Sequence, residues 1–198
     1  MSDTRKSILN AARRLFAEKG FYGASIAAIS DEVGITKQAL LHHFGAKEKL
    51  YGEVLQAISE RFISEAIQAS GGASDPEQRL ADLLLRLHQN AQSAPEDTRL
   101  LMRELLDVRR RADTARTWYM KPFLEALVVL LKQTPAWRGA SEAEALAAVY
   151  HILGAINYLV VSDATLGRMF GAASLAEVQQ AYPDLLRRQI RFLIQKRR

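Results

Sequence analysis

Apolar residues recur at spacings of three and four along almost the whole chain, and runs of alternating β-branched residues do not occur. This period matches the α-helix, in which residues three and four apart share a face, and differs from the two-residue period of a strand. We therefore expect an all-α fold with no sheet. Glycines and prolines divide the pattern into helices expected at about 4–19, then two short helices, and then about 47–70, 76–93, 96–111, 114–133, 141–167 and 174–196.

The distribution of charge suggests two regions. The chain has 198 residues, of which 48% are hydrophobic and 25% are charged, so it is long enough for one or two globular domains. Its formal net charge is +5, and basic residues outnumber acidic ones in residues 1–50 and again from Asp184 onward. We predict domains at 1–50 and 51–198. Basic segments of this size are usually solvated surfaces, so the charge alone is weak support for nucleic-acid binding.

Several classes of protein are excluded by what the sequence lacks. It contains no cysteine, so disulfide frameworks, thiolate metal sites and thiol nucleophiles are excluded. The first residues, MSDTRKSILNAARRLF, have no apolar signal core. The longest stretch without a charged residue, Ala145 to Ser162, contains polar residues and lacks basic flanks. We expect a buried helix there, no membrane span, and a cytoplasmic protein.

Residues 25–44, SIAAISDEVGITKQALLHHF, have the pattern of two short helices joined by a tight turn. Ser25 and Thr36 are residue types that cap helix N-termini, Gly34 allows a positive φ in the turn, and Ile35 can bury the turn itself. The side chains expected to face inward are Ile29, Val33, Leu40 and Phe44. The segment therefore predicts a helix-turn-helix.

The face of the second short helix that points away from the inward residues carries Lys37, Gln38, Leu41 and His42. These lie in the N-terminal half of the helix, the part that reaches base edges in a major groove. Lysine suits the O6 and N7 atoms of guanine, glutamine pairs with adenine N6 and N7, and leucine can contact a thymine methyl. We therefore expect the partner to be double-stranded DNA.

The stretch from Arg5 to Leu55 resembles the DNA-binding domain of the tetracycline-repressor-like (TetR) family of bacterial transcriptional regulators. The resemblance depends on the opening I-L-x-A-A-x-x-L-F, the link G-F-Y-G-A-S-I, the helix G-I-T-K-Q-A-L-x-H-H-F and the following K-E-x-L. It implies an N-terminal three-helix helix-turn-helix domain followed by a helical domain for ligand binding and dimerisation. Beyond residue 55 only length and helical character match.

The resemblance also assigns roles within the first domain. The residues that it places at the DNA interface are Ser25, Thr36, Lys37, Gln38, Ala39, Leu41, His42, His43 and Lys47. Lys37 and Gln38 match base-contacting positions, whereas Ser25, Thr36 and the helix start at Lys47 match phosphate-contacting ones; which histidine meets DNA stays open. Leu41 stands where a tyrosine is usual and Ala27 where a basic residue is common. We therefore expect fewer phosphate contacts and a shallower salt dependence than in typical members.

For the second domain, the resemblance implies a homodimer through the last two helices, a near-palindromic operator and a small-molecule effector. The alternative for those two helices is an ordinary monomer core. An effector pocket is expected from large apolar residues with a few polar tips: His88, Met102, Trp118, Tyr119, Phe123, Tyr150, Asn157 and Tyr158. Each of these residues is on its own more often plain core. Because no basic cluster accompanies them, we expect an uncharged or weakly polar hydrophobic ligand, whose binding moves the long helix that begins near Lys47.

No catalytic motif occurs in the sequence, and neighbouring histidines such as His42 and His43 point about 100° apart on a helix, so they cannot easily share one metal ion. We expect no catalytic residue, no metal site and no cofactor. The sequence thus favours a ligand-responsive DNA-binding regulator, a repressor that its effector releases. An alternative is a regulator whose second domain responds to a protein partner or to no effector, and a helical enzyme is the third possibility.

Overall fold

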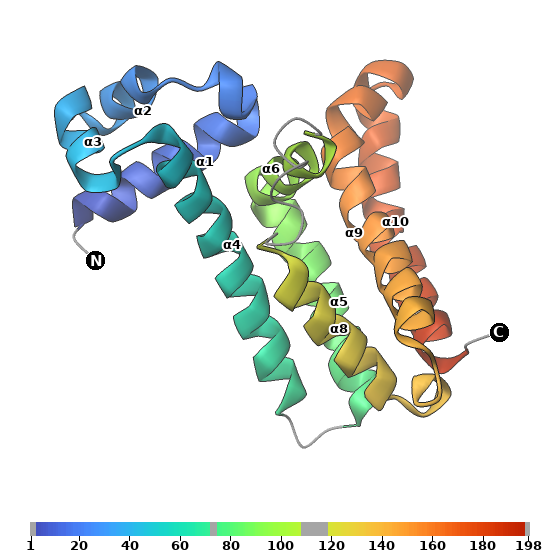
Figure 1. Ribbon diagram of the computed structural model, residues 1–198. Helices are drawn as coiled ribbons and strands as arrows, with labels where there is room; N and C mark the ends of the chain where they lie inside the picture. The colour runs from blue at the N-terminus through green and yellow to red at the C-terminus, as the bar shows by residue number, and fades with distance from the viewer. Residues whose placement is uncertain (1–2, 72–74, 108–118, 197–198) are drawn as a thin grey trace. The chain divides into compact units, whose positions relative to one another are not determined.

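The computed structural model describes residues 3–71, 75–107 and 119–196, and within these residues the chain forms only helices, turns and connecting segments. The prediction of an all-α fold is confirmed. The helices are α1 Asp3–Gly23, α2 Ile26–Val33, α3 Lys37–Phe44, α4 Lys47–Ser70, α5 Pro76–Ser93, α6 Pro95–Leu106, α8 Lys121–Gln133, the short 3-10 helix η2 Pro135–Trp137, α9 Glu142–Phe170 and α10 Ala172–Gln195 (Figure 1).

The chain divides into two compact units. The first consists of Met1–Glu60 with Glu96–Tyr119, and the second consists of Arg61–Pro95 with Met120–Arg198. Helix α4 therefore passes from the first unit into the second, whereas nearly all of α6 belongs to the first. The predicted domains, 1–50 and 51–198, did not anticipate that the chain returns to the first unit after α5.

The first unit is organised around α1, which packs on α2, and α2, which packs on α3. Helix α1 is interrupted at Gly20, whose φ of 72° is left-handed, so the residues up to Gly23 form a separate turn that leads to α2. This is the left-handed glycine that the sequence predicted at the end of the first helix. The largest fully buried side chains are Ile8, Phe16, Ile29, Leu40, Leu50 and Leu100.

The second unit is a helical bundle in which α9 packs against α8, α10 and α5, and α5 also packs against α8 and α10. Its fully buried side chains include Phe123, Leu127, Leu131, Ile152 and Ile156. The short helix η2, which the sequence did not predict, contributes Trp137, whose indole N–H donates a hydrogen bond of 2.8 Å to the carbonyl oxygen of Leu193 on α10. This bond ties the end of α10 to the α8–α9 connection.

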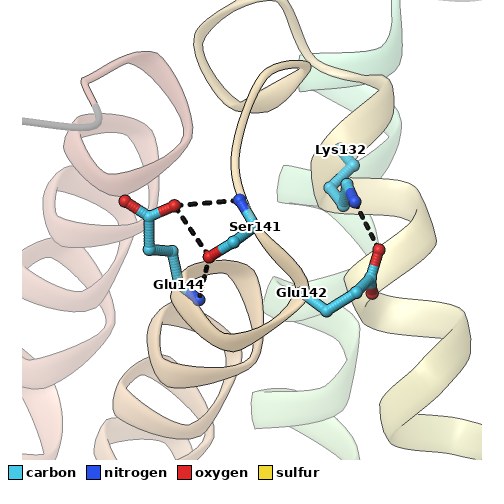
Figure 2. A network of polar contacts seen from close by, with 4 residues as sticks. All are labelled: Lys132, Ser141, Glu142 and Glu144. Carbon is cyan, nitrogen blue, oxygen red and sulfur yellow. Dashed lines mark hydrogen bonds and ion pairs between the residues drawn. The ribbon is translucent and has the colours of Figure 1, made fainter.

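The start of α9 shows how local chemistry fixes a helix end (Figure 2). The Ser141 hydroxyl accepts a hydrogen bond of 3.2 Å from the backbone N–H of Glu144, and the Glu144 carboxylate accepts one of 2.8 Å from the backbone N–H of Ser141. This capping box satisfies two N–H groups that would otherwise lack partners at the helix end. Lys132 of α8 pairs with Glu142 in the same turn and joins the two helices.

Two prolines act differently in the second unit. Pro122 lies in the first turn of α8, where its missing N–H costs nothing. The predicted helix at 114–133 begins only at Lys121, because residues 119–120 form a turn, and its part before residue 119 lies outside the described residues. Pro183 lies inside α10. Because proline cannot donate to the carbonyl four residues earlier, α10 lacks one internal hydrogen bond at this point.

Helix α9 is the one described helix that is long and apolar enough to cross a membrane, judged by length and composition alone. One third (33%) of its most apolar window is buried in the chain, and the helix packs against three neighbours in the bundle. The packing against three neighbours agrees with the bundle helix expected from the sequence, but most of the window is exposed in the single chain, so the helix is less buried than expected. Its remaining exposed face includes Tyr150 and Tyr158.

Candidate nucleic-acid interface

Helices α2 and α3 are joined by a turn whose conformation follows from its residue types. The Ser25 hydroxyl caps α2 by accepting a hydrogen bond of 3.0 Å from the N–H of Ala28, and the Thr36 hydroxyl caps α3 by accepting one of 3.1 Å from the N–H of Ala39. Between them, Gly34 adopts a left-handed conformation with φ 74° and ψ 32°. The turn predicted from the sequence thus has the two caps and the glycine that it requires.

Helix α3 has one buried face and one exposed face. Leu40 and Phe44, one turn apart, are buried. The guanidinium carbon of Arg5 lies over the ring of Phe44, 4.5 Å from its centroid. The opposite side presents the exposed side chains of Lys37, Gln38, Leu41, His42 and His43, whereas Ala39 is half-buried. The helix therefore offers a solvent-facing strip of the kind that enters a major groove.

An aromatic cluster packs the first turns of α4 against α1. The rings of Phe16 and Tyr51 meet edge-on with centroids 4.9 Å apart, and Phe21 meets Tyr51 in the same way at 5.1 Å. The ammonium nitrogen of Lys47 lies 4.5 Å from the centroid of the Phe21 ring. Lys47, one of the predicted phosphate contacts, is thus half-buried and held by a cation–π contact at the first residue of α4.

Much of the positive charge in the first unit is engaged within the protein. Arg5 pairs with Glu53 at 2.5 Å, Arg14 pairs with Glu32, and Arg13 pairs with Asp97 at 3.0 Å. In contrast, within the part of the chain that the structure describes, Lys37 and Lys49 are exposed and have no ion-pair partner. Lys49 was not among the predicted interface residues, although it lies beside the turn after α3, with its nitrogen 3.9 Å from the point where a side chain at Gly45 would begin.

The two histidines at the end of α3 lie next to each other without forming a common site. The rings of His42 and His43 meet edge-on with centroids 6.0 Å apart, and the centroid of the His43 ring lies 6.4 Å from that of Phe44. Both side chains are exposed, so each is accessible to DNA. Among the described residues, no group of three or more histidine or acidic side chains is arranged to hold a metal ion.

The predicted pocket residues fall in different parts of the structure. In the second unit, Phe123 is buried against Phe62 with ring centroids 5.3 Å apart, and His88 is buried in the same bundle. Tyr150 and Tyr158 are exposed on α9, and Asn157 is half-buried between them. The remaining three were predicted from the segment around residues 102–119: Met102 and Tyr119 belong to the first unit, and Trp118 lies outside the described residues.

His88 on α5 differs from the ordinary core histidine that the sequence favours. It is only 2% exposed, its ring lies 5.7 Å from that of Tyr182 on α10, and neither ring nitrogen has a partner at hydrogen-bonding geometry. Burial lowers the pKa of His88, and the backbone of Ile156 offsets part of this effect. The second unit thus contains a buried imidazole whose neutral form is favoured and whose ring nitrogens make no hydrogen bond of normal geometry.

The sequence analysis missed two buried carboxylates on α6, Asp97 and Glu104, which are 3% and 6% exposed. Asp97 pairs with Arg13 of α1, and Glu104 accepts a hydrogen bond of 2.7 Å from the hydroxyl of Tyr51 on α4. The signal was present in their spacing, because residues 97 and 104 are two turns apart on one helix face, together with the buried Leu100 and Leu101.

Comparison with known proteins identifies the family. A family model described as bacterial regulatory proteins, tetR family, matches residues 8–54. The chain is 30% identical over 131 residues to the HTH-type transcriptional repressor AcnR of Corynebacterium efficiens, an alignment that covers 58% of this chain and 69% of AcnR. Other curated relatives are covered over less than half of their length, as for AcnR of Corynebacterium glutamicum and NicS of Pseudomonas putida.

Solved structures share the fold over nearly the whole chain. The fatty acid degradation regulator FadR from Bacillus halodurans superposes with a TM-score of 0.71 at 19% identity, covering 94% of this chain and 96% of FadR. PfmR, a TetR family transcriptional regulator from Thermus thermophilus, gives 0.62 at 25% identity, covering 91% and 97%. The helix-turn-helix geometry, the family match and these relatives agree, and the chain is therefore a DNA-binding transcriptional regulator of the TetR family and not an enzyme.

Proposed function

We propose that this regulator is a repressor that binds a near-palindromic operator as a homodimer in the cytoplasm and is released by a small hydrophobic effector. The observation that carries the proposal is the two-sided character of α3. Leu40 and Phe44 hold one side in the core, while Lys37, Gln38 and Leu41 are exposed on the other. A short helix anchored in this way can place side chains at base edges without rearranging.

The exposed strip on α3 offers three different chemistries to the bases. Lys37 can donate to guanine O6 and N7, Gln38 can donate to and accept from adenine, and Leu41 can contact a thymine methyl. The caps and helix starts around the strip, at Ser25, Thr36 and Lys47, together with Ala39, His42 and His43, are proposed to hold the flanking backbone. Hydroxyl groups, backbone N–H groups and the positive end of a helix dipole all suit phosphate oxygens.

The homodimer is proposed to form through α9 and α10. On α10, the apolar residues Val178, Leu185 and Phe192 are exposed and recur every seven residues, so they form one stripe. On α9, the exposed face combines Tyr150 and Tyr158 with Gly154, at which an added side chain would meet nothing within 4 Å. The stripe and the small residues favour a symmetric pairing of these helices. A two-fold dimer would present two α3 helices to half-sites about 34 Å apart, which predicts a near-palindromic operator.

The effector is proposed to bind in the second unit. That unit contains the aromatic pair Phe62 and Phe123 and, at His88, a buried imidazole without a hydrogen-bond partner. Apolar surroundings with one or two polar atoms bind mostly hydrophobic ligands that carry a single neutral polar group. Because burial keeps His88 neutral, an uncharged ligand group that accepts or donates one hydrogen bond fits better than an anion.

The effector is proposed to act by shifting the protein between two states through α4, which belongs to the first unit up to Glu60 and to the second from Arg61. A coupling free energy of about 1 to 3 kcal/mol would change operator affinity by about 5-fold to 150-fold. The long helix can carry such a change because its first turns, with Leu50 and Val54, are buried in the DNA-binding unit.

The test begins with footprinting of the DNA upstream of the protein's own coding region, with and without a panel of neutral hydrophobic compounds. Lys37→Ala and Gln38→Ala should abolish the footprint while leaving the fold intact by circular dichroism. Lys121→Ala is the matched control, because Lys121 is exposed in the second unit and pairs with Glu125 of its own helix. Footprints that survive both α3 substitutions would refute the proposed interface. If only a protein partner, and no small molecule, releases the regulator from its DNA, the proposed small-molecule effector is wrong.

A further inference from the structure

Polar contacts near both ends of helix α6 join it to other helices of the DNA-binding unit. Near its N-terminus, the Asp97 carboxylate accepts a hydrogen bond of 3.0 Å from the Arg13 guanidinium of α1. Near its C-terminus, Arg103 donates one of 3.0 Å to the backbone carbonyl of Glu18, and Glu104 accepts one of 2.7 Å from the Tyr51 hydroxyl of α4. Both α1 and α4 are therefore attached to the same helix.

Two of these contacts are made by buried carboxylates, and they restrict how α1 and α4 can be placed against α6. Asp97 is 3% exposed and Glu104 is 6% exposed, whereas the side chain of Arg13 is 26% exposed. Burying a carboxylate is costly unless a charge or a hydrogen-bond donor compensates it, so such groups restrict the allowed arrangements of the helices more strictly than apolar side chains do. The apolar residues Leu100 and Leu101 between them complete the buried face of α6.

The helices held by α6 also hold the DNA-reading helix. Arg5 of α1 lies against the ring of Phe44, the last residue of α3, and pairs with Glu53 of α4. Tyr51 of α4 packs edge-on against Phe16 of α1. A displacement of α6 that changed the position of α1 relative to α4 would therefore reach α3 through side chains that are in contact.

We propose that Asp97 and Glu104 are positioning residues for DNA recognition: they fix α1 and α4 against α6 and thereby set the orientation of α3. The inference relies on the proposed function and adds to it a second connection besides α4. The chain enters the first unit from the second between Pro95 and Glu96, at the start of α6. A shift transmitted at that point would change operator affinity even if α4 kept its place.

The decisive experiment is a charge reversal in the full-length protein. Asp97→Asn leaves the partly buried Arg13 guanidinium without its charged partner and should weaken operator binding by about 10-fold, within the range known for coupled sites. Arg13→Asp combined with Asp97→Arg restores the pair in reverse and should return operator affinity to within about threefold of wild type, as a double-mutant cycle measures. Tyr51→Phe, which removes only the hydroxyl that Glu104 accepts from, should weaken binding in the same direction.

The matched control is the same reversal at Arg14 and Glu32, an ion pair between α1 and α2 whose side chains are 52% and 32% exposed. It should change operator affinity less than threefold, since exposed pairs contribute little. Binding to non-specific DNA should not weaken in any of the variants, because a misplaced α3 still presents the same charges. If Asp97→Asn lowers only the melting temperature and leaves operator affinity at the wild-type value, or if the reversal gives no rescue, the proposal is wrong.

Amide hydrogen exchange separates this proposal from the proposed function. Asp97→Asn should speed exchange in α1 and in the first turns of α4, and leave α9 and α10 unchanged, whether or not an operator has been found. If wild type shows no sequence-specific DNA binding, the proposed function fails while the exchange pattern still decides whether α6 positions α1 and α4. Unaltered exchange in α1 and α4 would overturn the positioning role on its own.

Discussion

Phe192→Ser tests the proposed pairing of α9 and α10 between subunits. Phe192 is 59% exposed in the single chain, at the end of the α10 stripe that includes Leu185. A phenylalanine can bury about 200 Å², so about 120 Å² is left for a partner to cover. At about 25 cal/mol per Å², this is about 3 kcal/mol for each protomer and about 6 kcal/mol for a symmetric pair.

Because about 1.4 kcal/mol corresponds to a tenfold change, the dimer dissociation constant should rise by about four orders of magnitude at most. Sedimentation equilibrium from nanomolar to micromolar protein measures this directly. Val129→Ser is the control, since Val129 is 57% exposed on α8 and lies outside the stripe. A Phe192→Ser protein that dimerises like wild type, or a control that dissociates equally, would refute the assignment of the interface.

Three further predictions concern single side chains. Lys47→Gln should reduce the slope of log affinity against log salt by about 0.9 per subunit, measured by fluorescence anisotropy, and an unchanged slope would mean that Lys47 holds no phosphate. His88→Phe should raise the free energy of unfolding by about 1 kcal/mol, because it removes two buried nitrogens without partners. Burial lowers the pKa of His88, so below about pH 6.5 the unfolded chain binds a proton at this residue and the folded chain does not. The stability of the wild type therefore falls as the pH drops, and the advantage of His88→Phe, measured by urea denaturation, should grow. Equal pH dependence of the two proteins would contradict this. Gly34→Val should cost about 1 to 2 kcal/mol from its positive φ alone, since space is open at that Cβ, and Gly34→Asn should cost less; equal melting temperatures for the two variants would exclude backbone strain.

The helices themselves could be predicted closely because their ends are marked locally. The segment 76–93 begins at a proline and was predicted with the bounds that the structure gives to α5, and the start of α4 at Lys47 was predicted as well. Gly20 and Gly34 take the left-handed conformations expected of them. These features depend on a few neighbouring residues, which a sequence displays directly.

The features that the sequence did not reveal depend on contacts between distant residues. Asp97 looks like an ordinary acidic residue in the first turn of a helix, where a negative charge is favourable. Only the packing of α6 shows that Asp97 is buried with Arg13, which is 84 positions earlier in the chain. His88 likewise follows the apolar periodicity of its helix, and the absence of a partner for its nitrogens becomes visible only once α5, α9 and α10 are packed.

The candidate DNA interface lies between these two cases. The exposed strip with Lys37 and Gln38 was predicted because a short helix with two inward residues leaves only one face free. The environment of Lys47 was not predicted, because its contact with Phe21 requires the start of α4 to fold back beside the end of α1. Periodicity thus identifies which residues point outward, and tertiary structure decides how free their charges are.

The internal pairing of Arg5, Arg13 and Arg14 has a consequence for how the protein is distributed in a cell. Chromosomal DNA offers millions of irrelevant sites, and attraction to them grows with the number of cations that a protein can bring to the backbone. A regulator whose arginines are already occupied by its own carboxylates releases few counterions at such sites. It should therefore spend less of its time sliding on bulk chromosome and more of it in free diffusion, so that a small number of copies suffices to keep one true site filled.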